Sequence, residues 1–323
     1  MRHSSHRPMT MLALAAVGAL GLGACSDAAG ESPTGGGEEI VIDTRHGPVA
    51  VERNAQRVAV LDNTAMETVR ELGVEPVALP KPLLPREMFA DWIADDEIRD
   101  AGTHREPDLD MVSAADPDLI IGGSRFDEHT SDLEAIATVI DIAPSDDSPE
   151  GYVQGLRDQT LALGEIFDAE QKAEELVAEL DDAITRAAEA TSGQSVFLAV
   201  ATGNIIDNGA GRIGRIIEPL NLNDVFASED LDADSVHQDS GLAPETIAQA
   251  NPDWVIVLDR DAATTAAAEA TPARELMAAQ EAFRGTTFMA QDQVIYLDPY
   301  FYTREGIQAY TEAYVQIAEA FGS

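Results

Sequence analysis

Short apolar runs and helix-like segments alternate along two stretches of the chain. In the first stretch, apolar runs over 57–62 and 118–123 read as strands, with helical patterns around them. In the second, the alternation resumes after Gly193, with strands predicted over 195–201 and 253–259. Strands that alternate with helices at this spacing are typical of a parallel sheet covered on both faces. The pattern therefore predicts two α/β lobes.

A sustained helical period separates the two stretches. Apolar side chains recur there at steps of three and four residues, which places them on one helical face. They are Ala173, Leu176, Leu180, Ile184 and Ala187. We expect an N-terminal lobe over 46–150, a bridging helix over 151–192 and a C-terminal lobe over 193–323 that closes with a helix over 307–321. A helical connector bends less readily than a linker of two or three strands, so we expect a small domain motion.

An internal echo supports this division. The segment from Asp110 to Ile121 aligns without gaps with the segment from Glu245 to Ile256, and each has a carboxylate seven residues before a Pro-Asp pair. Pro-Asp is a common helix-to-strand turn and explains part of the match. Because the apolar positions match as well, we interpret the echo as two similar lobes.

Composition narrows the classes of function. The 323 residues include 59 acidic and 20 basic side chains, a formal charge of -39, which would repel a phosphate backbone. Nucleic acid is therefore not an expected partner. Only Lys81 and Lys172 are lysines, so the other basic side chains are arginines, each a possible anion ligand. The single cysteine, Cys25, excludes an intramolecular disulfide and a multi-cysteine zinc site.

The first 24 residues have the pattern of a secretory signal. Arg2 and Arg7 precede a hydrophobic run over 9–22, and small residues lead to Cys25. This junction resembles the lipobox of bacterial lipoproteins, which implies cleavage before Cys25 and its acylation; the alternative is a chance cysteine after a simple signal peptide. Small, polar and acidic residues follow, and we expect a flexible tether over 25–45. The folded part would then be anchored to the outside of a membrane.

Several segments in a fixed order carry a resemblance to one protein family. They are RVAVLDNTAMETVRELGV, GTHREPDLDMVSAADPDLIIGGSR, the central helix, NGAGRIGRIIEPLNL, the stretch 236–261 and VIYLDPYFY. With these segments the sequence is similar to the substrate-binding lipoproteins of bacterial ferric-siderophore ABC importers, the helix-bridged class of periplasmic binding proteins, and especially to the subgroup for catecholate-type chelates. The resemblance implies two α/β lobes joined by a long rigid helix (class III) and a ferric siderophore as cargo, with Fe(III) carried inside the ligand and no intrinsic cofactor.

Three arginines are the candidate ligand contacts. Arg125 and Arg260 follow echoing strands, and the carboxyl ends of parallel strands open onto a ligand crevice. Arg212 lies in a glycine-rich turn at the start of a predicted helix. Guanidinium groups donate several hydrogen bonds and stack on electron-rich rings, which suits a ferric catecholate. The alternative is a surface ion pair for each; Arg215 and Arg304 are weaker candidates.

A histidine and a tyrosine are the candidate iron ligands. Ferric iron prefers anionic oxygen and accepts imidazole, and a tetradentate chelate leaves two positions open. The resemblance implies that His237 and Tyr302 fill them. The cluster at 300–302 is shortened relative to the family pattern, so Tyr300 is an alternative ligand. The alternative is a solvated histidine and a tyrosine that only packs against its neighbours.

Two carboxylates are candidates for docking to the transporter. Asp110 and Glu245 begin helices at echoing places, and in the family such acids pair with arginines of the permease dimer. An acid at a helix amino end also favours the helix dipole without any partner.

No catalytic motif supports an enzyme. The chain lacks a Gly-x-Ser-x-Gly elbow, a phosphate-binding Gly-x-x-x-x-Gly-Lys loop and a His-Glu-x-x-His motif. We therefore expect a binding protein rather than an enzyme, and we expect it to be a monomer. A receptor of the same fold for haem, a corrinoid or a hydroxamate siderophore is the alternative.

Overall fold

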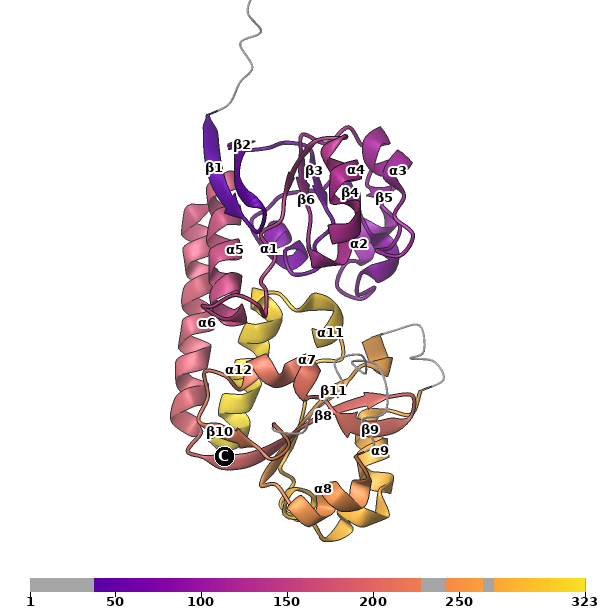
Figure 1. Cartoon of the computed structure of the whole chain (residues 1–323), viewed down its shortest axis with the longest axis vertical. Coiled ribbons are helices and arrows are strands. Elements are labelled where there is room, and N and C mark those ends of the chain that lie inside the picture. The colour runs from indigo at the N-terminus through magenta and orange to yellow at the C-terminus, as the bar shows by residue number, and fades with distance from the viewer. Residues whose placement is uncertain (1–37, 228–241, 264–269, 323) are drawn as a thin grey trace, which may run out of the picture. The chain divides into compact units, whose positions relative to one another are not determined.

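The N-terminal lobe is built on a parallel sheet. The computed structural model describes residues 38–227, 242–263 and 270–322, and Figure 1 shows its elements. The strand order is β5-β4-β3-β6-β7, and all four pairings are parallel. The strands are β3 (Val58–Val60), β4 (Ala78–Leu79), β5 (Arg99–Asp100), β6 (Leu119–Ile121) and β7 (Thr138–Ile140).

Helices cover both faces of this sheet. On one face α1 (Met66–Glu71) and α2 (Ala90–Ala94) pack against side chains such as Val60 and Leu79. On the other face α3 (Leu109–Ala114) and α4 (Thr130–Glu134) pack against Ala59 and Ile120. Because both faces are buried, the three central strands β3, β4 and β6 are continuously apolar rather than alternating, whereas the edge strands β5 and β7 include exposed residues. Two short 3-10 helices, η1 (Lys81–Leu83) and η2 (Ser124–His129), follow β4 and β6.

The C-terminal lobe has a second sheet with one added antiparallel strand. The parallel order is β10-β8-β11-β12, and β9 pairs with β8 in the antiparallel sense. The strands are β8 (Gln194–Thr202), β9 (Ile205–Asn208), β10 (Leu222–Asp224), β11 (Trp254–Asp259) and β12 (Val294–Tyr296). The helical elements are α7 (Ala210–Ile213), η3 (Gly214–Ile216), α8 (Pro244–Ala250), η5 (Asp261–Ala263), α9 (Ala273–Ala279), η7 (Glu281–Gly285), α10 (Thr287–Ala290), α11 (Phe301–Arg304) and α12 (Ile307–Phe321).

The bridge between the lobes differs from the single helix expected over 151–192. It consists of α5 (Tyr152–Ile166) and α6 (Glu170–Ala190), packed side by side. Asp168 between them has a left-handed backbone with φ 54°, which ends the first helix. At Gly164 a Cβ would stand 2.5 Å from the Ala173 Cβ, so only glycine permits this close packing. The helix that passes from lobe to lobe is α6, which also packs along α12.

Residues 39–45, which were expected to belong to the tether, are structured. They form β1 (Glu39–Thr44), which pairs in a hairpin with β2 (Gly47–Glu52), and the turn between them. Ile40 and Ile42 are buried while Glu39, Val41 and Asp43 are exposed, so the segment follows the two-residue period of a strand with one face in the core. The tether prediction overlooked this alternation.

Three other predictions concern the amino-terminal part of the chain. The signal segment, Cys25 and most of the tether lie outside the described residues. Among the helices that the structure does describe, none has both the length and the apolar composition that crossing a membrane requires.

The lobes meet where α11 turns into α12. A Cβ at Gly306 would stand 2.4 Å from the Thr64 carbonyl oxygen, so the backbone of one lobe lies directly on that of the other. The Asn63 amide donates a hydrogen bond of 3.1 Å to the Arg304 carbonyl. Arg304 itself is 4% exposed and donates to Glu67 at 2.8 Å and to Glu312 at 2.7 Å. These contacts fix the C-terminal lobe against the carboxyl end of β3.

Candidate ligand-binding site

Three guanidinium groups surround the side chain of Tyr302. The central guanidinium carbon of Arg212 lies 4.9 Å from the centre of the tyrosine ring. That of Arg260 lies at 5.3 Å and that of Arg125 at 5.7 Å. The sequence placed these arginines on three separate loops, and the structure brings them to one aromatic ring.

Local backbone geometry places each arginine. Arg125 lies in η2, which follows the carboxyl end of β6, and Arg260 directly follows β11. Arg212 lies in α7, which begins after Gly209. A Cβ at Gly209 would stand 2.7 Å from the backbone of Ala199, so glycine is needed where the turn crosses β8.

Neighbouring polar groups orient two of the guanidiniums. Arg125 Nε donates to Asn63 Oδ1 at 2.8 Å, and its Nη2 donates to Glu305 Oε2 at 3.3 Å. Arg260 Nη1 donates to Thr202 Oγ1 at 3.1 Å. Arg260 Nε is buried and has no acceptor among the residues that the structure describes. Arg260 therefore has a donor available for a ligand.

The arginines change the acidity of Tyr302. Burial alone would raise the pKa of its phenol, but the charge of Arg212, a hydrogen bond from Arg260 and the charge of Arg125 outweigh burial. The pKa of Tyr302 is therefore lowered from its ordinary value. Burial and the like charge of Arg260 lower the pKa of Arg212, although an arginine stays protonated at neutral pH.

Two adjoining cavities meet at this cluster. The first has a volume of about 500 Å³ and the second about 630 Å³. Both are lined by residues of the two lobes, and they share Asn63, His104, Arg125 and Tyr302. Volumes of this size suit a small-molecule ligand.

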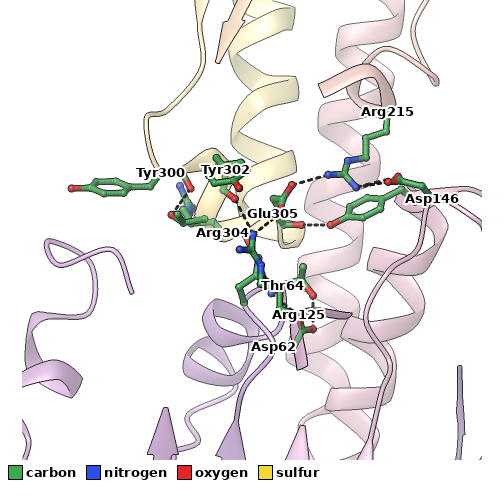
Figure 2. A network of polar contacts seen from close by, with 12 residues as sticks. Asp62, Thr64, Arg125, Asp146, Arg215, Tyr300, Tyr302, Arg304 and Glu305 are labelled. Atoms are coloured by element: carbon green, nitrogen blue, oxygen red, sulfur yellow. Dashed lines mark hydrogen bonds and ion pairs between the residues drawn. The ribbon is translucent and has the colours of Figure 1, made fainter. Parts of the chain in front are cut away.

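An acidic residue enters the first cavity. Glu305 has a left-handed backbone with φ 52° and a side chain that is 16% exposed. As Figure 2 shows, its carboxylate accepts from Arg215 at 2.7 Å as well as from Arg125. The Glu305 carbonyl accepts from the Tyr152 hydroxyl at 3.0 Å. Glu305 thus joins a guanidinium of each lobe and neutralises part of the positive charge of the cavity.

The two weaker arginine candidates are engaged in ion pairs. Arg215 binds Glu305 and also Asp146 at 3.1 Å, and its guanidinium carbon lies 4.0 Å from the ring centre of Tyr152. Arg304 is held by acids at the junction between the lobes. Both line a cavity and both are paired with carboxylates, although Arg215 Nε, like Arg260 Nε, has no acceptor among the described residues.

The remaining sequence-predicted residues are placed differently. Tyr300 points away from Tyr302 (Figure 2), and burial together with Glu87 and Asp298 raises the pKa of its phenol. Asp110 and Glu245 are exposed in the first turns of α3 and α8, and neither lines these cavities. His237 lies outside the described residues.

Sequence reasoning missed several lining residues. Asn63 directly follows the first predicted strand, so the rule that placed Arg125 at a carboxyl strand end could also have found it. His104 lies in a segment that carries the family resemblance, but nothing in that segment assigned the histidine a role, and no pattern distinguished Glu305. Burial, then Arg125 and Arg105, lower the pKa of His104, which favours its neutral form.

One group near the first cavity has the residue types of a metal site. Ligand atoms of His46, Asp127 and Asp141 lie within 4.8 Å of one another. The guanidinium of Arg45 pairs with Asp141 at 3.1 Å and with Asp127 at 3.4 Å. The two acids are thus balanced by a protein cation.

The fold and the site together define a class of protein. A helix-bridged solute-binding protein has two α/β lobes, each built on a mainly parallel sheet, and a helix that passes between them. This chain has both features, and a pair of arginine-rich cavities lies at the junction of its lobes. The periplasmic binding protein family matches residues 58–301, and the chain belongs to this family. The predicted family and fold class are confirmed.

Named relatives cover most of the chain. The petrobactin-binding protein YclQ of Bacillus subtilis is 26% identical over 97% of this chain and 98% of its own length. The ferric-anguibactin-binding protein FatB of Vibrio anguillarum is 26% identical over 69% of each. The crystal structure of the catecholate-siderophore-binding protein VctP of Vibrio cholerae has a TM-score of 0.75 at 24% identity, over 87% of this chain and 99% of that one.

Proposed function

We propose that this protein captures a ferric siderophore, of catecholate or mixed type, outside the cytoplasmic membrane and delivers it to an ABC importer. The observation that carries the proposal is the convergence of Arg125, Arg212 and Arg260 on Tyr302 between the lobes. Guanidinium groups donate to catecholate oxygens and stack on their rings. The names of the relatives YclQ and FatB support the same cargo class.

Tyr302 is the candidate iron ligand within this proposal. A phenol whose pKa is lowered by three guanidiniums forms a phenolate more readily, and ferric iron binds anionic oxygen strongly. Fe(III) is cargo here and arrives inside the siderophore. Tyr300, which points away from the cluster, is the weaker candidate, and His237 retains its proposed role as a second ligand.

The acidic protein surface opposes an anionic ligand only near the rim of the cavity. A formal charge of -39 would repel a trianionic chelate. Salt screens such repulsion beyond about 8 Å, while the arginines act within the cavity. Affinity should therefore depend on local contacts and change little when remote acids are neutralised.

The remaining parts of the proposal concern delivery. Cys25 carries the lipid anchor after removal of the signal segment, and the exposed acids Asp110 and Glu245 pair with the permease dimer. The protein acts as a monomeric receptor without turnover of its ligand.

A chelate panel tests the proposal. Ferric bis- and tris-catecholates, a ferric hydroxamate, haem and a corrinoid are titrated while tryptophan emission is followed. Trp92 is the informative reporter, because its ring centre lies 5.3 Å from that of Phe89, which lines the second cavity. We expect quenching at low micromolar or lower concentration for the catecholates only. Preferential binding of haem, the corrinoid or the hydroxamate would reject the proposed cargo.

Iron coordination by Tyr302 has its own readout. A tyrosine phenolate on Fe(III) gives a visible charge-transfer band, so Tyr302→Phe should shift the spectrum of the loaded protein. Tyr300→Phe is the matched control and should leave the spectrum unchanged. The reverse result would assign the ligand to Tyr300.

A further inference from the structure

The second cavity has an apolar wall that the arginine cluster does not explain. The wall comes from the N-terminal lobe, where Met66, Leu83, Leu84 and Phe89 line the cavity. Met66 and Phe89 are almost fully buried, whereas Leu83 is half-buried. A catecholate oxygen would gain no hydrogen bond from these side chains.

Proline makes this wall rigid. Pro80, Pro82 and Pro85 also line the cavity; Pro82 lies within η1 and the other two flank it. Each proline fixes its own φ, so less conformational entropy is lost when a ligand packs against the segment. The Lys81 ammonium donates to the carbonyls of Ile93 and Asp95, which ties the segment to α2.

The opposite wall comes from the C-terminal lobe. Tyr300 lines this cavity, and Figure 2 shows its ring extending away from Tyr302. Ala262 and Ala263 of η5 add small apolar surface. A flat or extended apolar group could therefore lie between the lobes.

The two cavities meet at the cluster, so one molecule could reach both. Arg125 and Tyr302 line each of them. From these contacts we propose that the ligand has two parts: an iron-bearing anionic head at the arginines and an apolar alkyl or aryl arm that lies between Leu83 and Tyr300. The assignment of the head rests on the proposed function, whereas the assignment of the arm rests on the apolar wall of the second cavity.

A matched pair of chelates tests the arm. The probes are a ferric bis-catecholate and the same chelate with an octyl chain. A fully buried methylene is worth roughly fourfold in affinity, and ordering the chain offsets part of this. We expect the octyl chelate to bind the wild type at least tenfold more tightly than the chain-free chelate.

Variants test which residues provide the affinity gained from the octyl chain. Leu83→Asn should remove most of the advantage of the chain and leave the affinity for the chain-free chelate nearly unchanged, because the substitution adds no charge and Leu83 does not line the first cavity. Tyr300→Ala should reduce the advantage from the other lobe. Leu161→Asn, at an exposed leucine of α5, is the matched control and should leave the advantage of the chain unchanged. Thermal unfolding verifies that each variant is folded.

The outcomes separate the two proposals. Equal affinity of the two chelates for the wild type, with the chain-free one bound, would overturn the apolar arm and leave the siderophore function standing. If neither chelate binds, the siderophore function falls, and anilinonaphthalene sulfonate then tests the cavity. Its emission should rise with the wild type and clearly less with the uncharged variant Leu83→Asn; the same emission with both would overturn the apolar subsite.

Discussion

The two lobes repeat one structural unit and then diverge from it. In each, a short helix ends in a left-handed residue before a proline: Asp116 with φ 49° and Asn251 with φ 46°. The aspartate after the proline accepts backbone N–H groups near the start of the neighbouring strand. Asp118 does so for Gln56 and Arg57, and Asp253 does so for Ser195. The echo in the sequence thus corresponds to one repeated helix-turn-strand unit.

The same unit sets the position of two arginines. Arg125 and Arg260 each follow the aspartate of the unit by seven residues. Arg125 then pairs with the carboxylate of Glu305, whereas the hydroxyl of Thr202 accepts from Arg260. The repeat therefore fixes where a guanidinium is placed, and the chain around it decides how much of the charge is left for a ligand.

The largest expected effect comes from removing the cluster in the C-terminal lobe. Arg212→Ala combined with Arg260→Ala should weaken binding of a ferric catecholate by about 4 kcal/mol, roughly a thousandfold. Both guanidiniums lie against Tyr302 and would meet the charged head. Tryptophan quenching measures the change. Arg186→Ala with Arg284→Ala, both exposed, is the control, and unchanged affinity in the cluster variant would reject the site.

The second-largest effect concerns Asp62, which follows the carboxyl end of β3 in the N-terminal lobe and is 3% exposed. The described part of the C-terminal lobe has no such carboxylate after its central strand, because β8 continues to Thr202. Burial raises the pKa of Asp62 to about 6, although hydrogen bonds from Thr64 and Gln159 oppose the rise. Between about pH 4 and pH 6 the unfolded chain releases this proton before the native protein does. The contribution of Asp62 to stability is therefore lost as pH rises through this window.

Asp62→Asn measures that loss. At pH 7 the variant should be more stable than the wild type by about 3 kcal/mol, and the difference should shrink toward pH 4. Urea unfolding at several pH values gives the free energies. A difference that stays constant with pH would show that Asp62 titrates alike in the folded and unfolded chains.

A smaller effect is the difference in affinity loss between variants of Arg125 and Arg260, the two arginines at equivalent positions of the repeat. Arg260→Ala should weaken binding about tenfold more than Arg125→Ala, because Glu305 already neutralises part of the Arg125 charge. In a Glu305→Gln background the two substitutions should become similar. Equal losses in the wild-type background would mean that the ion pair opens when the ligand binds.

The smallest effect tests the repeat itself. Asp118→Ala and Asp253→Ala should each lower the free energy of unfolding by about 1 kcal/mol, since each leaves N–H groups near a strand start without their acceptor. Chemical denaturation compares them. Clearly unequal losses would show that the two turns are similar in shape but not in energetics.

Much of the fold could be predicted because it depends on local pattern. The helix expected over 307–321 is α12, and the strand expected over 253–259 includes all of β11. The break at Asp168 was missed because a run of helix formers hides a single left-handed residue. The strand β1 was missed because its polar residues resemble those of the tether.

Only part of the candidate site could be predicted, for a physical reason. Arg125 and Arg260 follow strands, so the topology brings them to one edge. Glu305 enters the cavity through a backbone turn that the sequence does not signal. The apolar wall becomes a cavity only when the segment around Leu83 faces Tyr300 across the lobes, and such long-range placement leaves no local pattern.

The arginines around Tyr302 also constrain how this sequence can evolve. The guanidinium groups of three arginines all lie against the ring of Tyr302. An aliphatic side chain at this position would remove the attraction between the ring and the cations and leave the three like charges to repel one another. Loss of the ring is therefore tolerable only together with loss of a charge. Among descendants of this gene, the four positions should change in concert, and a lineage that abandons the tyrosine should also have exchanged at least one of the arginines.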